Sequence, residues 1–214
     1  MSNIVIFGAG GQAGTAAAAE ASARGHHVTA LGRGDADVTD PQAVARAALG
    51  KDAAIVAVAP SDGDPVEFYR VAATSLADGL VHAGVDRLVW VSIGTLLPDI
   101  GGVAPVDADG FPAKYLPFSL GHRAALEVFS RTELSWTAVS PAGDFDRTGG
   151  PRVGYVLSEV VALGAQISYA DHACALVDIA EQPGAHVSGH VGVLRPPSDA
   201  AVPTIGGAVA GAHQ

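Results

Sequence analysis

A glycine-rich segment near the start of the chain constrains the fold more strongly than any other feature of the sequence. Asn3 to Phe7 form an apolar run typical of a buried strand, and residues 8–14, with the sequence GAGGQAG, follow it directly. The Ala-rich run from Thr15 to Arg24 predicts a helix. Because glycine allows a tight turn and the helix N-terminus adds partial positive charge, this junction is suited to binding a diphosphate through backbone amides.

The spacing of the glycines indicates the kind of junction. Gly8, Gly11 and Gly14 give the pattern G-x-x-G-x-x-G, whereas the shorter pattern G-x-G-x-x-G fails because residue 13 is alanine. A glycine-rich turn without a ligand would have a similar composition, but its position between a first strand and a first helix favours a dinucleotide cofactor. The expected cofactor contacts in this segment are Gly8, Gly10, Gly11, Gln12, Ala13 and Gly14.

A basic residue follows the second predicted strand, His27 to Leu31. NAD-binding proteins commonly place Asp or Glu there to accept from the ribose 2′-hydroxyl, whereas here Gly32 and Arg33 follow the strand. A guanidinium at this point suits a 2′-phosphate, so the sequence favours NADP(H) over NAD(H); the alternative is a solvated loop arginine. Asp37 and Val38 then either flank the adenine or are plain loop residues.

Strand and helix signals alternate through the first half of the chain. Asp40-Pro41 combines an acidic N-cap with proline at the first helical position, and Gly84 is placed to end a later helix. The expected elements are a helix from Pro41, a strand at Asp52–Ala59, a helix at Tyr69–Ala83 and a strand at Arg87–Ser92. This order predicts an α/β fold with a doubly wound parallel sheet of the Rossmann type and right-handed crossovers. Ala59 and Pro60, where the third strand ends, join the expected cofactor contacts.

The second half of the chain has weaker signals. Gly94 to Pro117 is rich in Gly, Pro and Asp, and we interpret it as a lid or binding loop. The elements expected after it are a helix capped by Ser119 and running to about Arg131, a strand at Ser135–Val139, a loop at Gly143–Gly154, a helix at Ser168–Glu181 and an edge-type strand at His186–Leu194. We therefore expect one Rossmann domain over residues 1–195, with a small C-terminal extension on the substrate side, and a loosely packed tail over 196–214.

Composition argues against several classes of function. Hydrophobic residues make up 49% of the chain and the formal charge is −10, so nucleic acid is not expected as a partner, because phosphate contacts need clustered Lys and Arg. No apolar run approaches the roughly 20 residues of a membrane span. A single cysteine, Cys174, and a start without a basic region predict a cytoplasmic protein without a signal peptide. The histidines lack metal-ligand spacing, so no metal site is expected.

The catalytic pair of most short-chain dehydrogenases is missing from this sequence. In the motif Tyr-x-x-x-Lys the lysine lowers the pKa of the tyrosine, but Tyr115 is followed four positions later by Ser119. Tyr115 therefore stays only a candidate acid. Pro141 and Ala142, in the turn after a later strand, are expected beside the nicotinamide.

Two further residues are candidates for the chemistry. Ser92 follows a buried strand at the carboxyl edge, where doubly wound sheets bind their ligands, and is expected to contact both cofactor and substrate. His122 is expected in the first turn of its helix, where the helix dipole would lower its pKa and keep the imidazole neutral. Alternatively, Ser92 only caps a strand end and His122 is a structural or exposed histidine.

Several longer segments resemble a known family. Residues 110–115 (GFPAKY), 134–142 (LSWTAVSPA), 147–149 (RTG) and 167–173 (ISYADHA) are similar to atypical short-chain dehydrogenases described as NAD(P)H-flavin reductases. These are similar in turn to flavin/biliverdin-IXβ reductase and, more distantly, to the NmrA group. The resemblance covers nearly the whole chain, although residues 155–164 and the tail depart from it. It implies an NADPH-dependent hydride donor acting on a flat conjugated acceptor, with Ser92 and His122 in the active site.

Three functions fit these features. The first is a reductase of flavins or quinones, whose conjugated rings spread the incoming charge so that a Tyr-Lys acid is dispensable. The second is an NmrA-like regulator that binds NADP(H) without turnover. The third is a specialised carbonyl or double-bond reductase that uses His122 or Tyr115 as acid. For the reductases we expect a small aromatic or conjugated substrate, and for the protein a monomer or homodimer.

Overall fold

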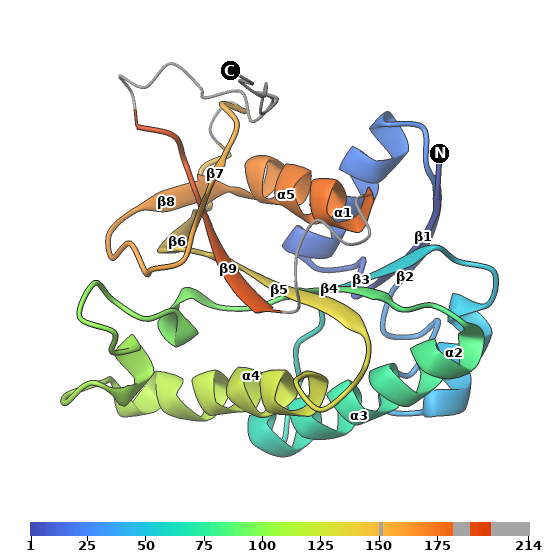
Figure 1. Cartoon of the computed structure of the whole chain (residues 1–214), viewed down its shortest axis with the longest axis horizontal. Helices are drawn as coiled ribbons and strands as arrows, with labels where there is room; N and C mark the ends of the chain where they lie inside the picture. Colours follow the sequence, from blue (N-terminus) through green and yellow to red (C-terminus); the bar gives the residue numbers. More distant parts are fainter. Residues whose placement is uncertain (150–151, 182–188, 198–214) are drawn as a thin grey trace, which may run out of the picture.

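A seven-stranded sheet between two layers of helices forms the body of the protein (Figure 1). The computed structural model describes residues 1–149, 152–181 and 189–197. The strands are β1 Asn3–Phe7, β2 His27–Leu31, β3 Ala53–Val56, β4 Arg87–Val91, β5 Ser135–Pro141, β6 Asp144–Asp146, β7 Val156–Ser158, β8 Gln166–Ser168 and β9 Gly189–Leu194. The helices are α1 Gln12–Ala23, α2 Pro41–Ala48, α3 Pro65–Ala83, α4 Leu116–Phe129 and α5 Tyr169–Glu181, with short 3-10 helices at Gly94–Leu96, Pro105–Asp107 and Ala113–Tyr115.

The order of the strands confirms the predicted Rossmann-type sheet. It runs β2-β1-β3-β4-β5-β9-β7, and every neighbouring pair is parallel except β7 with β9. The chain leaves β1 toward β2 on one side and returns to β3 on the other, so the order of strands reverses between β1 and β3. In sheets of this type ligands bind at the carboxyl ends of the strands beside such a reversal.

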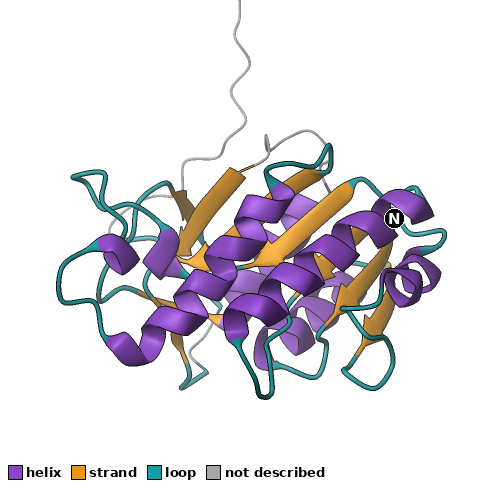
Figure 2. Cartoon of the chain, turned by 90° about the horizontal axis from the view of Figure 1, so that it is seen from below, coloured by secondary structure: helices purple, strands orange, loops and turns teal. Residues whose placement is uncertain are grey.

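Helices cover both faces of the sheet. Helices α1 and α5 pack on one face, and α2, α3 and α4 pack on the other (Figures 1 and 2). Each face has its own cluster of buried apolar residues, with Ile4 and Ile6 in one and Val5 and Phe7 in the other. Burial on both faces explains why the inner strands have no polar alternation.

Local signals correctly place the start of α2 and the end of α3, whereas α1 begins at Gln12, three residues before the predicted start at Thr15. The Asp40 carboxylate accepts a hydrogen bond from the amide of Gln42 at 2.9 Å, as expected of an N-cap, and Gly84 ends α3 with a φ of 75°. Helix α3, however, begins at Pro65, four residues before the predicted start at Tyr69. Asp64 caps it by accepting from the amide of Val66 at 2.9 Å, which is the same Asp-Pro start as in α2.

The predicted start of the following helix was wrong. Helix α4 begins at Leu116 rather than after Ser119, because Pro117 occupies a first-turn position where its missing N–H costs nothing. Ser119 lies inside the helix, and its hydroxyl is 3.0 Å from that of Thr95. His122 consequently lies in the second turn, beyond the first turn where the helix dipole acts most strongly.

The last strand was also misread. Strand β9 lies between β5 and β7 and is not an edge strand, because the three residues of β7 extend the sheet by one more strand. A strand of three residues gives no periodic signal, so the sequence predicts no element at residues 156–158. Strand β6 similarly lies inside the predicted loop 143–154. Residues 186–188 of the predicted strand, and all of the expected tail beyond residue 197, lie outside the described residues.

Within the described part of the chain, no helix combines the length and the apolar character that crossing a bilayer requires.

Helices α3 and α4 meet at a glycine. A Cβ atom built on Gly121 would lie 2.6 Å from Cδ2 of Tyr69 and 2.8 Å from the carbonyl oxygen of Pro65. The bare backbone therefore lets α4 approach α3 closely, which sets the position of the next residue, His122, against Tyr69.

Replacing this glycine should destabilise the protein. In Gly121→Ala the better helix propensity of alanine, about 1 kcal/mol, is outweighed by overpacking against the Pro65 backbone, which costs about 1–3 kcal/mol. We expect a lower midpoint in urea unfolding followed by circular dichroism. Gly34→Ala is the control, because a Cβ there meets no atom within 4 Å. Equal midpoints for the two variants would contradict the close contact.

Candidate cofactor and acceptor site

Two glycines at the first strand-to-helix junction are required by the protein backbone itself. Gly8 has a φ of 82°, and a Cβ on it would lie 2.2 Å from the carbonyl oxygen of Ala57, after β3. A Cβ on Gly14 would lie 2.2 Å from the carbonyl oxygen of Gly8. The junction is further tied to β2, because the amides of Gly8 and Ala9 both donate to the carbonyl oxygen of Leu31 at 2.9 Å. The backbones of β1, β3 and α1 therefore pack closely around residue 8, which only glycine allows.

The remaining glycines of this loop have a different surrounding. A Cβ on Gly10 would meet no atom within 4 Å, and one on Gly11 would be 3.6 Å from its nearest neighbour. Gly11 is the N-cap of α1, and no side chain caps the helix there. Gln12 and Ala13 open the helix, so their amides lie in its first turn. The fold itself does not require glycine at positions 10 and 11, because a side chain there would meet no close neighbour. A ligand that approaches the backbone closely does require it, so these residues fit a diphosphate.

Arg33 lies beside the ends of two strands. Its side chain is exposed, and its Nη2 atom makes a long hydrogen bond of 3.4 Å to the carbonyl oxygen of Ala59. The guanidinium therefore connects the segment that follows β2 with the segment that follows β3. The Asp37 carboxylate is occupied locally, because it accepts from the amide and the hydroxyl of Thr39 at 2.8 and 2.6 Å. Val38 packs on the apolar cluster under α2 and α3. The structure thus brings Arg33 and Ala59 together at the carboxyl edge, near the glycine loop.

The two candidate chemistry residues are buried on the α4 face of the sheet. Ser92 follows β4, and its amide donates to the carbonyl oxygen of Val139 at 2.9 Å. The ring of His122 lies 4.2 Å from that of Tyr69, centroid to centroid, and 4.8 Å from that of Phe118. The Ser92 hydroxyl and the Nδ1 atom of His122 have no hydrogen-bond partner among the described residues. Ordered water or a ligand would satisfy such atoms, and the same is true of Trp90 Nε1 and Thr137 Oγ1, which are also buried without a partner among the described residues.

Burial, rather than the helix dipole, keeps His122 neutral. Removal from water and, to a smaller extent, the nearby His190 together lower the pKa of His122 to about 3. The expectation of a neutral imidazole therefore stands, but its proposed cause was wrong, because His122 is in the second helical turn. A neutral imidazole keeps one N–H donor and one bare nitrogen.

Three further predicted site residues lie at the end of β5 and at the start of α4. Pro141 and Ala142 are buried at the end of β5. A Cβ on Gly94 would be 2.6 Å from the Pro141 carbonyl oxygen, so the segment after β4 packs directly against the end of β5. Tyr115 is 53% exposed at the start of α4, with the Lys114 ammonium 4.6 Å from its ring centroid. That ammonium lies over the ring face, so the two residues do not form the Tyr-Lys arrangement of a general acid.

Sequence reasoning missed three side chains that surround His122 or lie close to it. Tyr69 is fully buried and donates to the carbonyl oxygen of Val58 at 3.3 Å. Ser140 and His190 form a hydrogen bond of 2.7 Å between their Oγ and Nε2 atoms. No local signal could have found them, because the contacts join α3 to β3 and β5 to β9 across long stretches of chain.

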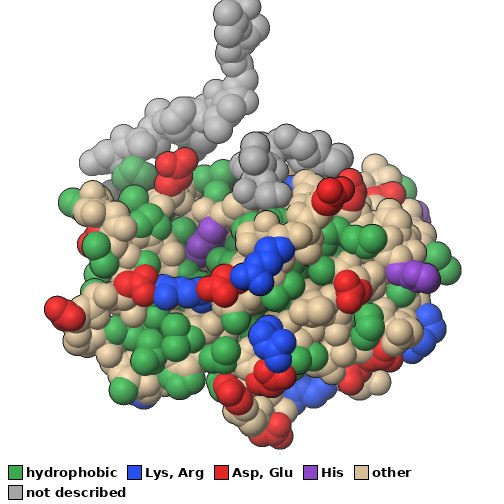
Figure 3. Space-filling view, turned by 60° about the horizontal axis from the view of Figure 1, so that its bottom comes forward, with side chains coloured by type: hydrophobic (Ala, Val, Ile, Leu, Met, Phe, Trp, Pro, Cys, Tyr) green, Lys and Arg blue, Asp and Glu red, His purple; other side chains and the backbone are tan. Residues whose placement is uncertain are grey.

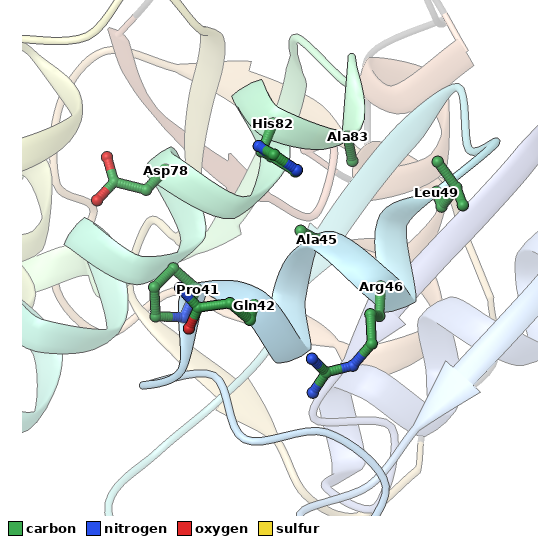
Figure 4. Close-up of a pocket in the computed structure, with 8 residues that line it drawn as sticks. All are labelled: Pro41, Gln42, Ala45, Arg46, Leu49, Asp78, His82 and Ala83. Carbon is green, nitrogen blue, oxygen red and sulfur yellow. The ribbon is translucent and has the colours of Figure 1, made fainter.

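Open hollows also occur away from these residues. A cavity of about 550 Å³ lies between α2 and α3 and is lined by Pro41, Gln42, Ala45, Arg46, Leu49, Asp78, His82 and Ala83 (Figure 4). It contains none of the predicted site residues. The face formed by the lower helices mixes charges of both signs and gathers hydrophobic side chains toward the end where the 94–117 loop lies (Figure 3). That loop exposes Ile100, Val103 and Tyr115.

Comparisons with known proteins agree with this geometry. Residues 33–183 match the model of the NAD(P)H-binding family, and the chain belongs to that family. It is 33% identical to the uncharacterized protein YwnB of Bacillus subtilis over 203 residues, covering 84% of this chain and 92% of that one.

Solved structures share the fold over nearly the whole chain. A candidate NADH-flavin reductase of Streptococcus pneumoniae, SP1627, superposes with a TM-score of 0.79 at 28% identity, covering 92% of this chain and all of that one. A candidate exported protein of Burkholderia pseudomallei gives a TM-score of 0.77 at 34% identity, covering 91% of this chain and 100% of that one. The chain is therefore a Rossmann-type NAD(P)H-binding protein similar to a candidate flavin reductase.

The buried histidines should make stability depend on pH. Burial lowers the pKa of His122 to about 3 and those of His172 and His190 to about 4, whereas an unfolded histidine titrates near 6.5. Below about pH 6.5 the unfolded chain therefore binds protons that the folded chain does not, and the free energy of unfolding falls by about 1.4 kcal/mol per pH unit for each histidine.

Replacing one of these histidines should reduce this slope. His122→Phe keeps the ring packing. As the pH is lowered from 6.5 to 4.5, we expect its free energy of unfolding to decrease less steeply than that of the unaltered protein, by about 1.4 kcal/mol per pH unit, the contribution of one proton. His82→Gln, at an exposed position, should keep the slope of the unaltered protein. An unchanged slope in His122→Phe would show that His122 is protonated in the folded state.

Proposed function

We propose that this protein is an NADPH-dependent reductase that transfers hydride to a flat conjugated acceptor of the flavin or quinone type. The observation that carries the proposal is the arrangement at the strand-order reversal. There the glycine junction after β1 leaves room beside uncapped helix amides, and Arg33 lies across the ends of β2 and β3.

The cofactor would be held along the carboxyl edge by residues at the ends of five strands, β1 to β5. Backbone amides of residues 8–14 would bind the diphosphate, and Arg33 the 2′-phosphate. The residues proposed to line the adenine and nicotinamide ends are Asp37, Val38, Ala59, Pro60, Ser92, Pro141 and Ala142. NADPH supplies a hydride when bound, and the protein has to orient the acceptor and satisfy its polar atoms.

The acceptor class follows from what surrounds Ser92 and His122. Both offer uncharged hydrogen-bonding groups, and the aromatic rings of Tyr69 and Phe118 pack against the histidine. A conjugated acceptor needs no strong acid because its ring system spreads the incoming charge, which agrees with the missing Tyr-x-x-x-Lys motif. The similarity to a candidate NADH-flavin reductase supports the same class. Tyr115, at the exposed rim, is a further proposed contact to the acceptor.

Arg33 should decide the preference between the two nicotinamide cofactors. We expect Arg33→Ala to weaken NADPH binding by about 10- to 100-fold, the loss of a charge-assisted contact to phosphate, and to leave NADH binding nearly unchanged. Isothermal titration calorimetry measures both dissociation constants. Arg70→Ala is the matched control, since Arg70 is an exposed arginine on α3. Equal losses for both cofactors would contradict the proposed phosphate contact.

Turnover separates the proposed reductase from its alternatives. NADPH oxidation followed at 340 nm should be measurable with riboflavin, menadione or dichloroindophenol as acceptor. Binding of NADPH without any turnover would instead favour an NmrA-like regulator. Complete loss of turnover in His122→Ala, with NADPH binding intact, would favour a specialised carbonyl or double-bond reductase in which His122 is the acid.

A further inference from the structure

Two hydroxyl groups connect the turn that follows β4 with helix α4. Oγ1 of Thr95 and Oγ of Ser119 are 3.0 Å apart, and either oxygen can be the donor of this hydrogen bond. Ser119 is 2% exposed, whereas Thr95 is half-buried. Among the described residues neither hydroxyl makes a further hydrogen bond. The pair needs an explanation, because apolar side chains of the same size would avoid the cost of burying two hydroxyls.

The two hydroxyls carry one proton more than their own hydrogen bond uses. Each hydroxyl has one O–H donor and two lone pairs, so one of the two protons is left for another acceptor. If Thr95 were the donor, the leftover proton would belong to Ser119, which is closed off from water and would be left unsatisfied. Ser119 is therefore the donor. The Thr95 hydroxyl accepts from Ser119 and offers its own proton to a partner outside the pair.

The turn that carries Thr95 is fixed against the ends of two neighbouring strands. It is a single turn of 3-10 helix, and a Cβ on its first residue, Gly94, would lie 2.6 Å from the carbonyl oxygen of Pro141, in β5. Directly after the turn, Leu97 is buried, and its Cδ1 atom would be 2.8 Å from a Cβ on Gly192, in β9. The Thr95 hydroxyl is therefore presented by a tightly packed backbone, as a preorganised donor has to be.

This position adjoins the proposed acceptor site. Thr95 is three residues after Ser92, and its turn packs against α4. On α4, Ser119 and His122 are three positions apart, so they lie on the same side of the helix, one turn from each other. Thr95 therefore lies where the segment that carries Ser92 meets the helix that carries His122. Pro141, against which its turn packs, is one of the residues proposed to line the nicotinamide.

We propose that Thr95 donates a hydrogen bond to an oxygen of the bound acceptor, and that Ser119 is a positioning residue that holds the Thr95 hydroxyl in this orientation. The inference rests on the proposed function and narrows the acceptor to one with a carbonyl oxygen conjugated to the atom that receives the hydride.

The contact strengthens as the reaction proceeds. Hydride and its electron pair pass from NADPH to the acceptor, which leaves NADP⁺ and puts negative charge on the conjugated oxygen. The reduced acceptor then leaves as an anion or takes up a proton from solvent water, and Thr95 keeps its own proton throughout. A hydrogen bond to a charged oxygen is stronger than one to a neutral carbonyl, so Thr95 stabilises the transition state more than the bound acceptor.

The first test removes the hydroxyl but keeps the shape of the side chain. In Thr95→Val, with saturating NADPH and menadione as acceptor, we expect kcat to fall about 10- to 100-fold, the scale of one hydrogen bond to a charged group. The KM for menadione should change less than kcat, and the dissociation constant of NADPH should stay within about twofold, since the contact is to the acceptor. Thr74→Val is the matched control, because Thr74 is an exposed threonine on α3 whose hydroxyl donates to the carbonyl oxygen of Arg70.

A double variant tests the role of Ser119. Ser119→Ala should lower kcat by less than Thr95→Val does, because the Thr95 hydroxyl is still present but is free to turn away. If Ser119 acts only through Thr95, the double variant has the kcat of Thr95→Val, whereas independent effects multiply. Effects that multiply would overturn the positioning role. Thr95→Ser, which keeps the hydroxyl, should retain most of the activity that Thr95→Ala loses.

A binding measurement needs no turnover. Riboflavin binding to the protein saturated with NADP⁺ is followed by quenching of flavin fluorescence, and we expect Thr95→Val to weaken it about 3- to 10-fold, the scale of a neutral hydrogen bond. Unchanged kcat or unchanged riboflavin affinity in folded Thr95→Val, or equal losses in Thr95→Ser and Thr95→Ala, would overturn the inference and leave the reductase in place. Absence of turnover with every acceptor in the unaltered protein would instead refute the proposed function, and the inference with it.

Discussion

The contact between the carbonyl oxygen of Gly8 and the backbone of Gly14 is the constraint on which the rest of the site depends. A side chain at residue 14 would lie 2.2 Å from that oxygen, and one at residue 8 would lie 2.2 Å from the Ala57 carbonyl oxygen. The first helix therefore starts directly against the end of β1, and β1 directly against β3. This closeness puts the open end of α1 at the place where the order of strands reverses, which is where the cofactor is proposed to bind.

The same junction explains how much of the fold could be predicted from the sequence. Its signals are local, since Gly8, Gly11 and Gly14 lie within seven residues, and the Asp-Pro start of α2 is read from two adjacent residues. Where the local signal was ambiguous, the prediction failed. Ser119 has the side chain of an N-cap, but Pro117 had already begun α4, and Ser119 bonds to Thr95 instead. Neighbours in sequence could not show this, because Thr95 lies in the 3-10 helix that follows β4, 24 residues earlier in the chain.

The candidate site was predictable only in part, for a related reason. Ser92 and His122 stood out because one follows a buried strand and the other resembles an active-site position, and the structure does bury both on one face. Their surroundings come from β9 and α3, which contact them only after the sheet has formed. The neutral state of His122 illustrates the difference, since the expected state was reached through burial by Tyr69, Phe118 and the sheet rather than through the helix end. Sequence reports a residue type, but burial is a property of the whole assembly.

Charged groups are distributed to suit such a site. At the far end of α1, Arg24 contacts Glu20, Asp178 and Glu181, and buried Arg87 donates to the carbonyl oxygen of Ile179 at 2.7 and 3.0 Å. Both arginines bind groups in the last turn of α5, away from the carboxyl edge.

A chain with a net charge of −10 repels an anionic nucleotide at a distance, but this repulsion is screened beyond about 8 Å at physiological salt. Binding must then come from contacts at short range, and the proposed contacts of that kind, the uncapped amides of α1 and the guanidinium of Arg33, lie together at the phosphate end. The side chains proposed to lie around the nicotinamide are uncharged. Such surroundings suit an uncharged ring system better than a further anionic group.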